Sequence, residues 1–438
     1  MEKTKIIATV NNTKTAEELI KKGVDAIRLN MSYITQKDAE AIINKINEVN
    51  QKLNKNTAIL IDLEGPRVKT GKFTNGKATL NTKDKIRIYT DDIKGDKTGF
   101  SVNYKGLIND LKYKDIIKLN KGSVELEVNE KGLDYVLCEV TKGGDVYDDD
   151  KIFFPNTKIK NKFLTKKDKE DIIFAHKMNV DYLTSSLIKS AEEVQKINDV
   201  LIELMDEHIT LLAKIENKSA INNLDSIINS SDGIILDRGD LGIQMPIEEI
   251  PNIQKKVIKK CLEKEKLSII TAEFNSFYQA LPNRAEVSDL ANLVSSATDC
   301  IMLTSETSIG TNPVKTLGTI KKIINKAEEI PQITQKNKDT AIILCESASL
   351  CATKLNAKAI IVITNTGEIA EKLSKLKPVC PIIAVTDNEK TLKSLGLCYG
   401  VKPVRLKNLQ EVLSKIIDVK QKDKIIIVHK NFIKIEEI

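Results

Sequence analysis

The sequence predicts an α/β protein built on a TIM (β/α)8 barrel, with a small β-barrel domain inserted into it and a second α/β domain after it. Three observations support this architecture. Eight strand-like apolar runs alternate with segments of helical periodicity, residues 72–154 interrupt this series with short strands and turns, and a shorter α/β repeat ends the chain. At 438 residues the chain is long enough for two or three hydrophobic cores.

The expected barrel strands are short runs of aliphatic residues bounded by polar turns. They are Lys5–Val10, Ala26–Ser32, Ala58–Leu63, Tyr182–Ser186, Leu211–Glu216, Gly233–Leu236, Ser268–Glu273 and Cys300–Ser305. Amphipathic helices lie between most of these strands, among them Thr15–Lys22, Lys37–Asn50, Lys166–Met178, Ala191–Leu204 and Asn252–Glu263. In such a barrel the functional side chains are expected at the C-terminal ends of the strands.

Residues 72–154 follow a different pattern. Their expected strands, which Gly, Asn and Asp turns separate, are Ile86–Tyr89, Ile116–Leu119, Glu125–Val128 and Tyr135–Val140. Because this segment lies between the third and fourth barrel strands, it is expected at the barrel rim, where it can close over the site as a lid. The predicted domains are therefore a barrel of residues 1–71 and 155–329 and an all-β lid of residues 72–154.

The pattern changes again at Ile330–Gln335 and predicts a C-terminal α/β domain of residues 330–438. Its expected helices are Thr340–Leu355, Glu368–Leu376 and Glu389–Leu395, and its expected strands are Ala359–Ile363, Pro381–Val385 and Lys424–His429. Only Asn431–Ile438 follows the last of these strands. The domain contains no nucleotide-binding fingerprint.

Composition argues against several classes of function. The net charge is +7, but the basic residues are spread along the chain and aromatic residues make up 4%, so we expect no nucleic-acid partner. No apolar run approaches the ~20 residues that cross a bilayer, so we expect no membrane partner. The seven cysteines form no CxxC pair and the N-terminus has no signal-peptide profile. Reduced thiols and a cytoplasmic location are therefore expected.

Charged groups gather where two neighbouring barrel strands end. Lys214 and Glu216 are two residues apart, so on a strand their side chains share a face. Asp240 follows the next expected strand. Two carboxylates beside one lysine can hold a divalent cation and leave an ammonium group facing the same ligand.

A series of motifs along nearly the whole chain, in order, resembles the pyruvate kinase family. The motifs are Arg28-Leu29-Asn30-Met31-Ser32, Asp62-Leu63-Glu64-Gly65-Pro66-Arg67-Val68-Lys69-Thr70-Gly71, Lys214-Ile215-Glu216-Asn217, Arg238-Gly239-Asp240-Leu241-Gly242, Asn283-Arg284-Ala285-Glu286, and Asp299-Cys300-Ile301-Met302-Leu303 with Glu306-Thr307. Such a family member is usually a homotetramer and transfers the phosphoryl group of phosphoenolpyruvate to ADP in glycolysis, which gives pyruvate and ATP.

The resemblance also implies roles for individual residues. Glu216 and Asp240 are expected to hold Mg²⁺ or Mn²⁺, and Lys214 and Arg28 to stabilise charge on the transferring phosphoryl group, since this reaction depends on charge neutralisation and alignment. The positions matched to substrate contacts are Arg28, Lys214, Gly239, Asp240 and Ala272, and those matched to nucleotide contacts are Arg28 and Lys69.

One departure from the family pattern concerns K⁺. Asn30, Ser32 and Asp62 match the family's K⁺ ligands, but Leu63 and Arg67 stand where the family usually has Thr and Glu. The lost oxygen weakens the site, which we interpret as vestigial, and the guanidinium of Arg67 can supply the missing positive charge. We therefore expect that K⁺ is not required.

The other departures concern proton delivery and the lid. Ala272 stands at the position of the threonine assigned to protonating the enolate, and Thr271 is expected to point to the opposite face of its strand. Lys69 replaces an arginine, and Asp148–Asp150 replaces a lysine-bearing stretch. These changes keep two alternatives open, a catalytically weakened barrel that binds Mg²⁺ and phosphoenolpyruvate as a sensor or assembly partner, and a Mg²⁺-dependent pyruvate aldolase.

Overall fold

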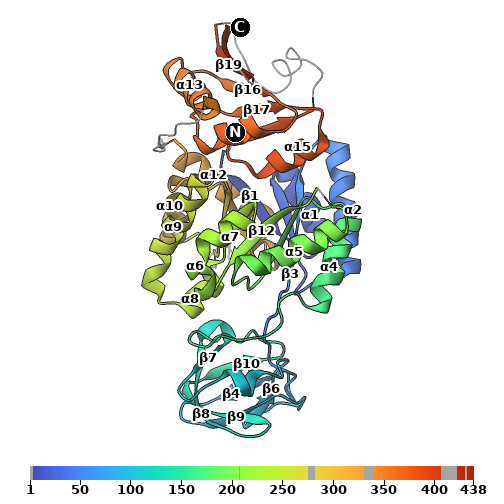
Figure 1. Ribbon diagram of the computed structural model, residues 1–438, viewed down its shortest axis with the longest axis vertical. Helices are drawn as coiled ribbons and strands as arrows, with labels where there is room; N and C mark the ends of the chain where they lie inside the picture. Colours follow the sequence, from blue (N-terminus) through green and yellow to red (C-terminus); the bar gives the residue numbers. More distant parts are fainter. Residues whose placement is uncertain (1–2, 207, 275–281, 330–339, 406–421, 430–431) are drawn as a thin grey trace.

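The structure is a computed structural model that describes residues 3–206, 208–274, 282–329, 340–405, 422–429 and 432–438. Three bodies lie one after another along the long axis of the molecule (Figure 1). The barrel is in the middle, the C-terminal α/β domain is at one end and the all-β domain is at the other. The predicted fold class is confirmed, while the domain boundaries at 71/72, 154/155 and 329/330 stay a prediction.

Eight parallel strands close the barrel in the order β1-β15-β14-β13-β12-β11-β3-β2. They are β1 (Lys5–Thr9), β2 (Ala26–Asn30), β3 (Ala58–Leu63), β11 (Tyr182–Ser185), β12 (Thr210–Ile215), β13 (Gly233–Leu236), β14 (Leu267–Ala272) and β15 (Cys300–Leu303). Most of them end one or two residues before the predicted run, because the rim residues leave the strand ladder and form the site.

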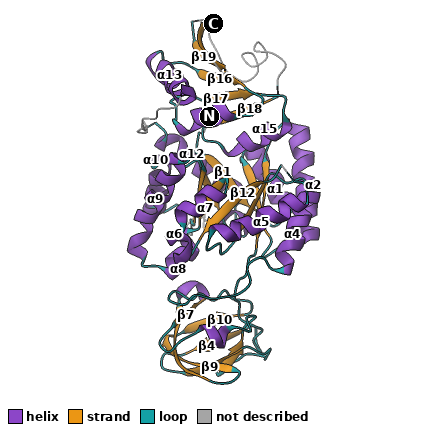
Figure 2. Cartoon of the chain, viewed as in Figure 1, coloured by secondary structure: helices purple, strands orange, loops and turns teal. Residues whose placement is uncertain are grey.

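Helices surround the strands on the outside of the barrel (Figure 2). They are α1 (Thr13–Lys22), α2 (Gln36–Leu53), α4 (Lys166–Lys177), α5 (Ala191–Glu203), α6 (Lys218–Asn222), α7 (Leu224–Ser230), α8 (Arg238–Gln244), α9 (Ile250–Glu263), α10 (Arg284–Ser295), α11 (Ser305–Ser308) and α12 (Pro313–Ala327). Local sequence fixes their ends. Thr35 and Asp38 form a capping box before α2, and Gly23, with φ of 88°, ends α1 in a left-handed conformation.

Alternate residues of each barrel strand point in opposite directions. On β12, Leu211, Ala213 and Ile215 belong to the hydrophobic core between the strands and the surrounding helices. Leu212 instead belongs with Ile235 to the core of inward-facing residues. This alternation defines which residues can reach the interior of the barrel at its rim.

The inserted segment consists mainly of β-strands and contains one four-residue helix. A five-stranded sheet has the order β6-β5-β9-β8-β7 and a two-stranded sheet pairs β10 with β4. The elements are β4 (Lys77–Leu80), β5 (Lys85–Tyr89), β6 (Gly99–Ser101), α3 (Leu107–Asp110), β7 (Ile116–Leu119), β8 (Val124–Lys131), β9 (Tyr135–Lys142) and β10 (Gly144–Tyr147). Strands β4, β6 and β10 were not predicted, because their sequences KATL, GFS and GDVY contain few aliphatic residues, unlike IIKL of β7.

The C-terminal domain contains a five-stranded sheet in the order β18-β17-β16-β19-β20. Its elements are α13 (Thr340–Lys354), β16 (Ala359–Ile363), α14 (Glu368–Lys375), β17 (Ile382–Val385), α15 (Glu389–Ser394), β18 (Val401–Val404), β19 (Lys424–His429) and β20 (Phe432–Glu437). Strand β18 was not predicted, and the segment expected as a short tail forms β20, which pairs antiparallel with β19. The predicted break at Ile330–Gln335 lies outside the described residues.

Two further expectations concern the chain as a whole. None of the seven cysteines, all of which lie in described segments, forms a disulfide, and six of them are buried, which agrees with the expected reduced thiols. Among the described residues, no helix combines the length and the apolar character needed to cross a bilayer.

A buried ion cluster joins the C-terminal domain to the barrel. Asp299, just before β15, accepts hydrogen bonds from Lys377 Nζ at 2.6 Å and Lys375 Nζ at 2.9 Å. Asp299 is 2% exposed. Burial by itself would raise the pKa of Asp299, but the two lysines reverse this effect and hold it well below its usual range.

We expect Asp299→Asn to lower the free energy of unfolding by about 3 kcal/mol at pH 7, because two buried lysines lose their counter-charge. Since the folded pKa of Asp299 is depressed, its stabilisation is present above the unfolded pKa of about 3.9 and is lost as the pH falls through the folded pKa. The difference in urea unfolding between Asp299→Asn and the unchanged protein should therefore be smaller at pH 3 than at pH 7. Asp225→Asn, which removes an exposed partner of Lys260, is the control and should cost less than about 0.5 kcal/mol.

Candidate active site

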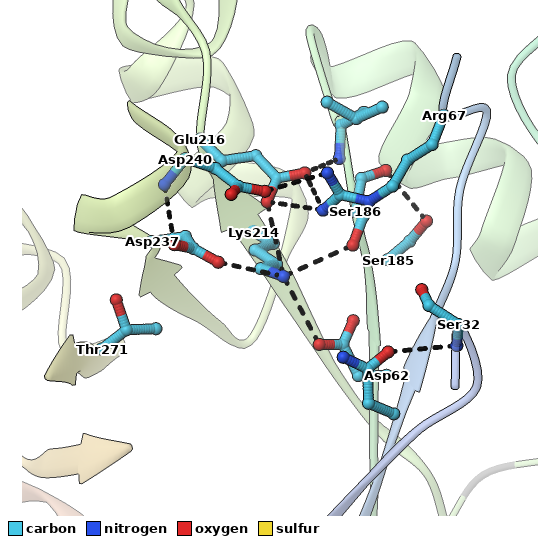
Figure 3. Close-up of polar contacts among 12 residues, drawn as sticks. Ser32, Asp62, Arg67, Ser185, Ser186, Lys214, Glu216, Asp237, Asp240 and Thr271 are labelled. Carbon is cyan, nitrogen blue, oxygen red and sulfur yellow. Dashed lines mark hydrogen bonds and ion pairs between the residues drawn. The ribbon is translucent and has the colours of Figure 1, made fainter. Parts of the chain in front are cut away.

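The inner face of the barrel ends in charged residues at its C-terminal rim (Figure 3). On β12, Lys214 lies two residues after the inward-facing Leu212, so its side chain points to the same face of the strand. Glu216 lies two residues further on, just beyond the end of the strand, and its side chain also points inward. Lys214 is 3% exposed and Glu216 is fully buried. The ammonium group of Lys214 lies 3.4 Å from Glu216 Oε2, so the two side chains share one face of the strand, as their spacing predicted.

Lys214 also contacts acidic groups from two other strands. Its Nζ lies 3.1 Å from Asp237 Oδ2 and 3.5 Å from Asp62 Oδ2, and it donates to Ser186 Oγ at 3.4 Å. Burial opposes the charged form of Lys214, but the carboxylates outweigh burial and raise the pKa of the amine. The group is therefore a permanent cation at neutral pH.

Asp237 is a site residue that the sequence analysis did not identify. It follows β13 and its Oδ1 accepts the Asp240 backbone N–H at 3.3 Å, which caps helix α8. Oxygen atoms of Asp237, Glu216 and Asp240 all lie within 4.8 Å of one another. The signal in the sequence was an aspartate at the end of an apolar run, three residues before Asp240.

Arg67 joins the two carboxylates that were expected to hold a metal. Its Nη1 donates to Asp240 Oδ2 at 2.9 Å, and its Nη2 donates to Glu216 Oε1 and Oε2 at 3.0 and 3.1 Å. Lys151 Nζ adds a second cation, 3.3 Å from Asp240 Oδ2. Burial by itself would raise the pKa of Asp240, but Arg67 and Lys151 reverse this effect and hold it well below its usual range. Both carboxylates are thus neutralised by side chains of the chain itself.

Arg28, on β2, is a further basic residue of the inner rim. Its guanidinium donates to Asp62 Oδ2 through Nε at 2.8 Å and to Thr9 Oγ1 through Nη1 at 2.9 Å. Asp62 Oδ2 therefore bridges Arg28 and Lys214. The other oxygen, Oδ1, is buried and has no hydrogen-bond partner among the described residues.

The other two residues matched to K⁺ ligands are close together in the chain. Asn30 Oδ1 accepts the backbone N–H of Ser32 at 3.1 Å, and both residues line the same cavity as Arg28. The Leu63 side chain is fully buried in the outward-facing core, so it contributes no side-chain ligand to this site. The structure therefore brings Asn30, Ser32 and Asp62 to one region without a side-chain oxygen from position 63.

The charged rim borders a cavity of about 620 Å³ between the barrel and the lid. Arg28, Lys214, Gly239 and Asp240 line it. An added Cβ at Gly239 would lie 2.5 Å from Glu273 Oε1, so any larger residue would require the Glu273 side chain to move. Lys69, expected at the nucleotide, is not among the residues that line the cavity.

Lys69 instead belongs to the connection between barrel and lid. Its ammonium group is paired with Glu64, and its backbone N–H donates to Asn103 Oδ1 at 2.8 Å. Lys69 was expected to contact the nucleotide, but among the described residues its contacts lie in the connection between barrel and lid.

The acidic run Asp148–Asp150 does line the cavity, but its carboxylates have partners within the lid. Asp148 accepts the Phe73 N–H at 2.7 Å, Asp149 pairs with Lys72, and Asp150 accepts the Asn120 N–H at 2.7 Å. These contacts fasten the ends of the lid to each other. They reduce the repulsion that three free acids would exert on a polyphosphate.

The expected orientation of β14 is wrong. Ala272 belongs to the outward-facing core. Leu267 and Ile269 belong to the inward-facing core, and Thr271 shares their face of the strand because it follows Ile269 by two residues. Ala272 is therefore not placed at the substrate, and Thr271 points inward. The Thr271 hydroxyl accepts the Arg238 N–H at 3.1 Å and donates to the Leu236 carbonyl at 3.2 Å. Beyond it, Glu273 reaches the cavity.

Comparisons with known proteins agree with this architecture. The family model described as "Pyruvate kinase, barrel domain" matches residues 1–317, and that described as "Pyruvate kinase, alpha/beta domain" matches residues 343–437. A pyruvate kinase of Clostridium perfringens is 36% identical over 419 residues, which cover 92% of this chain and 88% of that protein. One from Clostridium acetobutylicum is 35% identical, covering 95% and 92%. The crystal structure of a pyruvate kinase from Cryptosporidium parvum superposes with a TM-score of 0.89 at 28% identity, covering 100% of this chain and 96% of that one.

Proposed function

Because this chain belongs to the pyruvate kinase family, we propose that it transfers the phosphoryl group of phosphoenolpyruvate to ADP and forms pyruvate and ATP. The observation that carries the proposal is that Lys214, Asp240 and Arg28 line one cavity, while the buried Glu216 contacts Lys214 directly behind it. Phosphoryl transfer requires a fixed array of cations around the transferring group more than covalent chemistry. A permanently charged Lys214 and the planar guanidinium of Arg28 supply such an array.

The donor set fits Mg²⁺ or Mn²⁺. Glu216 and Asp240 would hold the ion and Asp237 offers a third carboxylate, since hard divalent cations prefer oxygen ligands. When bound, the metal supplies positive charge to the phosphoryl oxygens. Arg67 now bonds to two of these carboxylates, so we propose that it gives up at least part of this contact when the metal is bound.

The chain's own residues divide the remaining work. Lys214 balances charge on the phosphoryl group and on the enolate, and Arg28, held by Asp62 and Thr9, braces the phosphoryl oxygens. Gly239 leaves room for substrate beside Asp240. The Thr271 hydroxyl is committed to backbone groups, so we propose that water in the cavity delivers the proton to the enolate.

We propose that the enzyme works without K⁺, because Arg67 already places a positive charge beside Glu216 and Asp240. Pyruvate formation in sodium buffer should change less than about twofold on addition of KCl, since the added ion is redundant electrostatically. The control is the same titration with NaCl, which separates ionic strength from a specific effect. A many-fold increase with KCl alone would contradict the proposal.

The test of the function is release of pyruvate from phosphoenolpyruvate and ADP with Mg²⁺. Turnover supports the proposed reaction, whereas tight binding of phosphoenolpyruvate without turnover would favour a sensor or assembly role. Aldol condensation of pyruvate with an aldehyde would favour the aldolase alternative. We further propose a cytoplasmic homotetramer as the working form, which sedimentation of the purified protein would test.

A further inference from the structure

A second cavity lies beside the two chain segments that connect barrel and lid. Arg67, Lys151 and Phe153 line both this cavity and the catalytic one, so the connecting strands form a shared wall. We refer to the second cavity as the hinge pocket. Its barrel side includes Leu187 and Lys189, after β11, and residues 217–219, after β12.

The hinge pocket is strongly basic. Besides Arg67 and Lys151 it is lined by Lys158, Lys189 and Lys218, and its lining contains no aspartate or glutamate. Arg67 and Lys151 are neutralised by the catalytic carboxylates. Lys158 and Lys218 have no hydrogen bond or ion pair with any described residue, and both are exposed.

Lys189 lies deeper than the other two lysines. Its ammonium group donates to the Ile159 carbonyl at 2.9 Å and to Asn161 Oδ1 at 3.4 Å, so neutral oxygens satisfy it. Burial lowers the pKa of Lys189, and the charge of Lys158 adds to this effect, while the carboxylates of Glu193 and Asp110 oppose it. Lysines that crowd together without a carboxylate in the lining create a positive potential in the pocket.

The rest of the lining is apolar. Val68, Ile152, Phe154 and Ile159 are buried side chains that face the hinge pocket. A ligand that matches both the basic and the apolar side chains of the pocket has a doubly charged anionic group and a carbon skeleton. A phosphate monoester carries about −1.5 to −2 charges at pH 7, which matches several ammonium groups better than a single carboxylate does.

We propose that the hinge pocket binds a small organic phosphate at a site separate from the catalytic cavity. Such a ligand would touch the connecting strand at residues 151–159 and the barrel loops at residues 187–189 and 217–219. It would therefore link lid and barrel directly. The proposed phosphate site does not depend on the proposed reaction, because Lys158, Lys189 and Lys218 do not line the catalytic cavity.

Pyridoxal 5′-phosphate is a suitable probe, because its phosphate and aromatic ring match the two parts of the pocket. Its aldehyde condenses with a lysine amine to an imine, which borohydride reduces to a stable adduct that peptide mass spectrometry locates. We expect at least one of Lys158, Lys189 and Lys218 to be labelled about tenfold faster than the exposed Lys177, since a basic cleft concentrates anions. Inorganic phosphate should suppress this labelling but not that of Lys177.

A double variant, Lys158→Gln/Lys218→Gln, tests whether the pocket acts as a unit. In the full chain it should abolish the protection of Lys189 by inorganic phosphate and leave basal pyruvate formation unchanged. Labelling of all three lysines at the rate of Lys177, or labelling that inorganic phosphate does not suppress, would overturn the proposal. Neither outcome depends on turnover, so failure of the hinge site and failure of the proposed reaction are distinguishable.

Discussion

Replacement of Lys214 by methionine is expected to lower the rate of pyruvate formation by at least about 10³-fold, the scale of losing one cation at a transferring phosphoryl group. The ammonium group of Lys214 lies within 3.5 Å of three carboxylates and is a permanent cation, whereas methionine is neutral. The measurement is pyruvate release under saturating phosphoenolpyruvate and ADP with Mg²⁺. The loss should appear in kcat, because the cation acts on charge that develops in the transition state.

Lys177→Met is the matched control, since it removes an exposed lysine at the end of α4. Its rate should equal that of the unchanged protein. Circular dichroism should show that Lys214→Met is folded, because loss of a buried cation also leaves Asp62, Glu216 and Asp237 without part of their counter-charge. A folded Lys214→Met variant with near-normal turnover would remove the basis of the proposed chemistry.

The second large effect is expected from the double variant Leu63→Thr/Arg67→Glu, which restores the residues usual at these positions in the family. It exchanges a buried positive charge beside Glu216 and Asp240 for a negative one. In sodium buffer, activity should fall by about 10²- to 10³-fold, the scale of losing one electrostatic contact at a transition state. Addition of KCl should recover part of it, because K⁺ near Asn30, Ser32 and Asp62 can then replace the positive charge lost at Arg67.

Arg67→Lys is the control for the charge itself. Lysine keeps the positive charge but loses the bidentate contact with Glu216 and Asp240, so this variant should remain independent of K⁺ with a moderate loss of activity. If the double variant stays inactive at every KCl concentration while it is folded, the interpretation of Arg67 as an internal substitute for K⁺ is wrong.

Much of the fold could be predicted because its signals are local. Aliphatic runs bounded by polar turns indicated all eight barrel strands, and each predicted run overlaps an observed strand. The failures were short elements such as β6 and β10, which pair with strands earlier in the inserted domain, and the strand β20, which pairs with its neighbour β19. For such segments, periodicity carries little information.

The orientation of β14 shows where reasoning along one strand fails. Counting residues from Asp240 placed Ala272 at the substrate, but a count does not fix which face is inside. The register with β13 does so, because Ile269 pairs with Ile235, an inward-facing residue. Thr271 therefore shares the inner face with Ile269.

The sequence by itself determined the barrel, the inserted lid and the shared face of Lys214 and Glu216, because alternation along a strand depends only on neighbours in the chain. Only the tertiary structure decided that Asp237 lies beside Glu216 and Asp240, and that Arg67 and Lys151 contribute the opposite charge there. Arg67 and Lys151 lie 84 residues apart in the sequence, on the two different segments that connect the barrel to the lid. Their meeting at Asp240 depends on how the inserted domain returns to the rim, and no local pattern encodes that path.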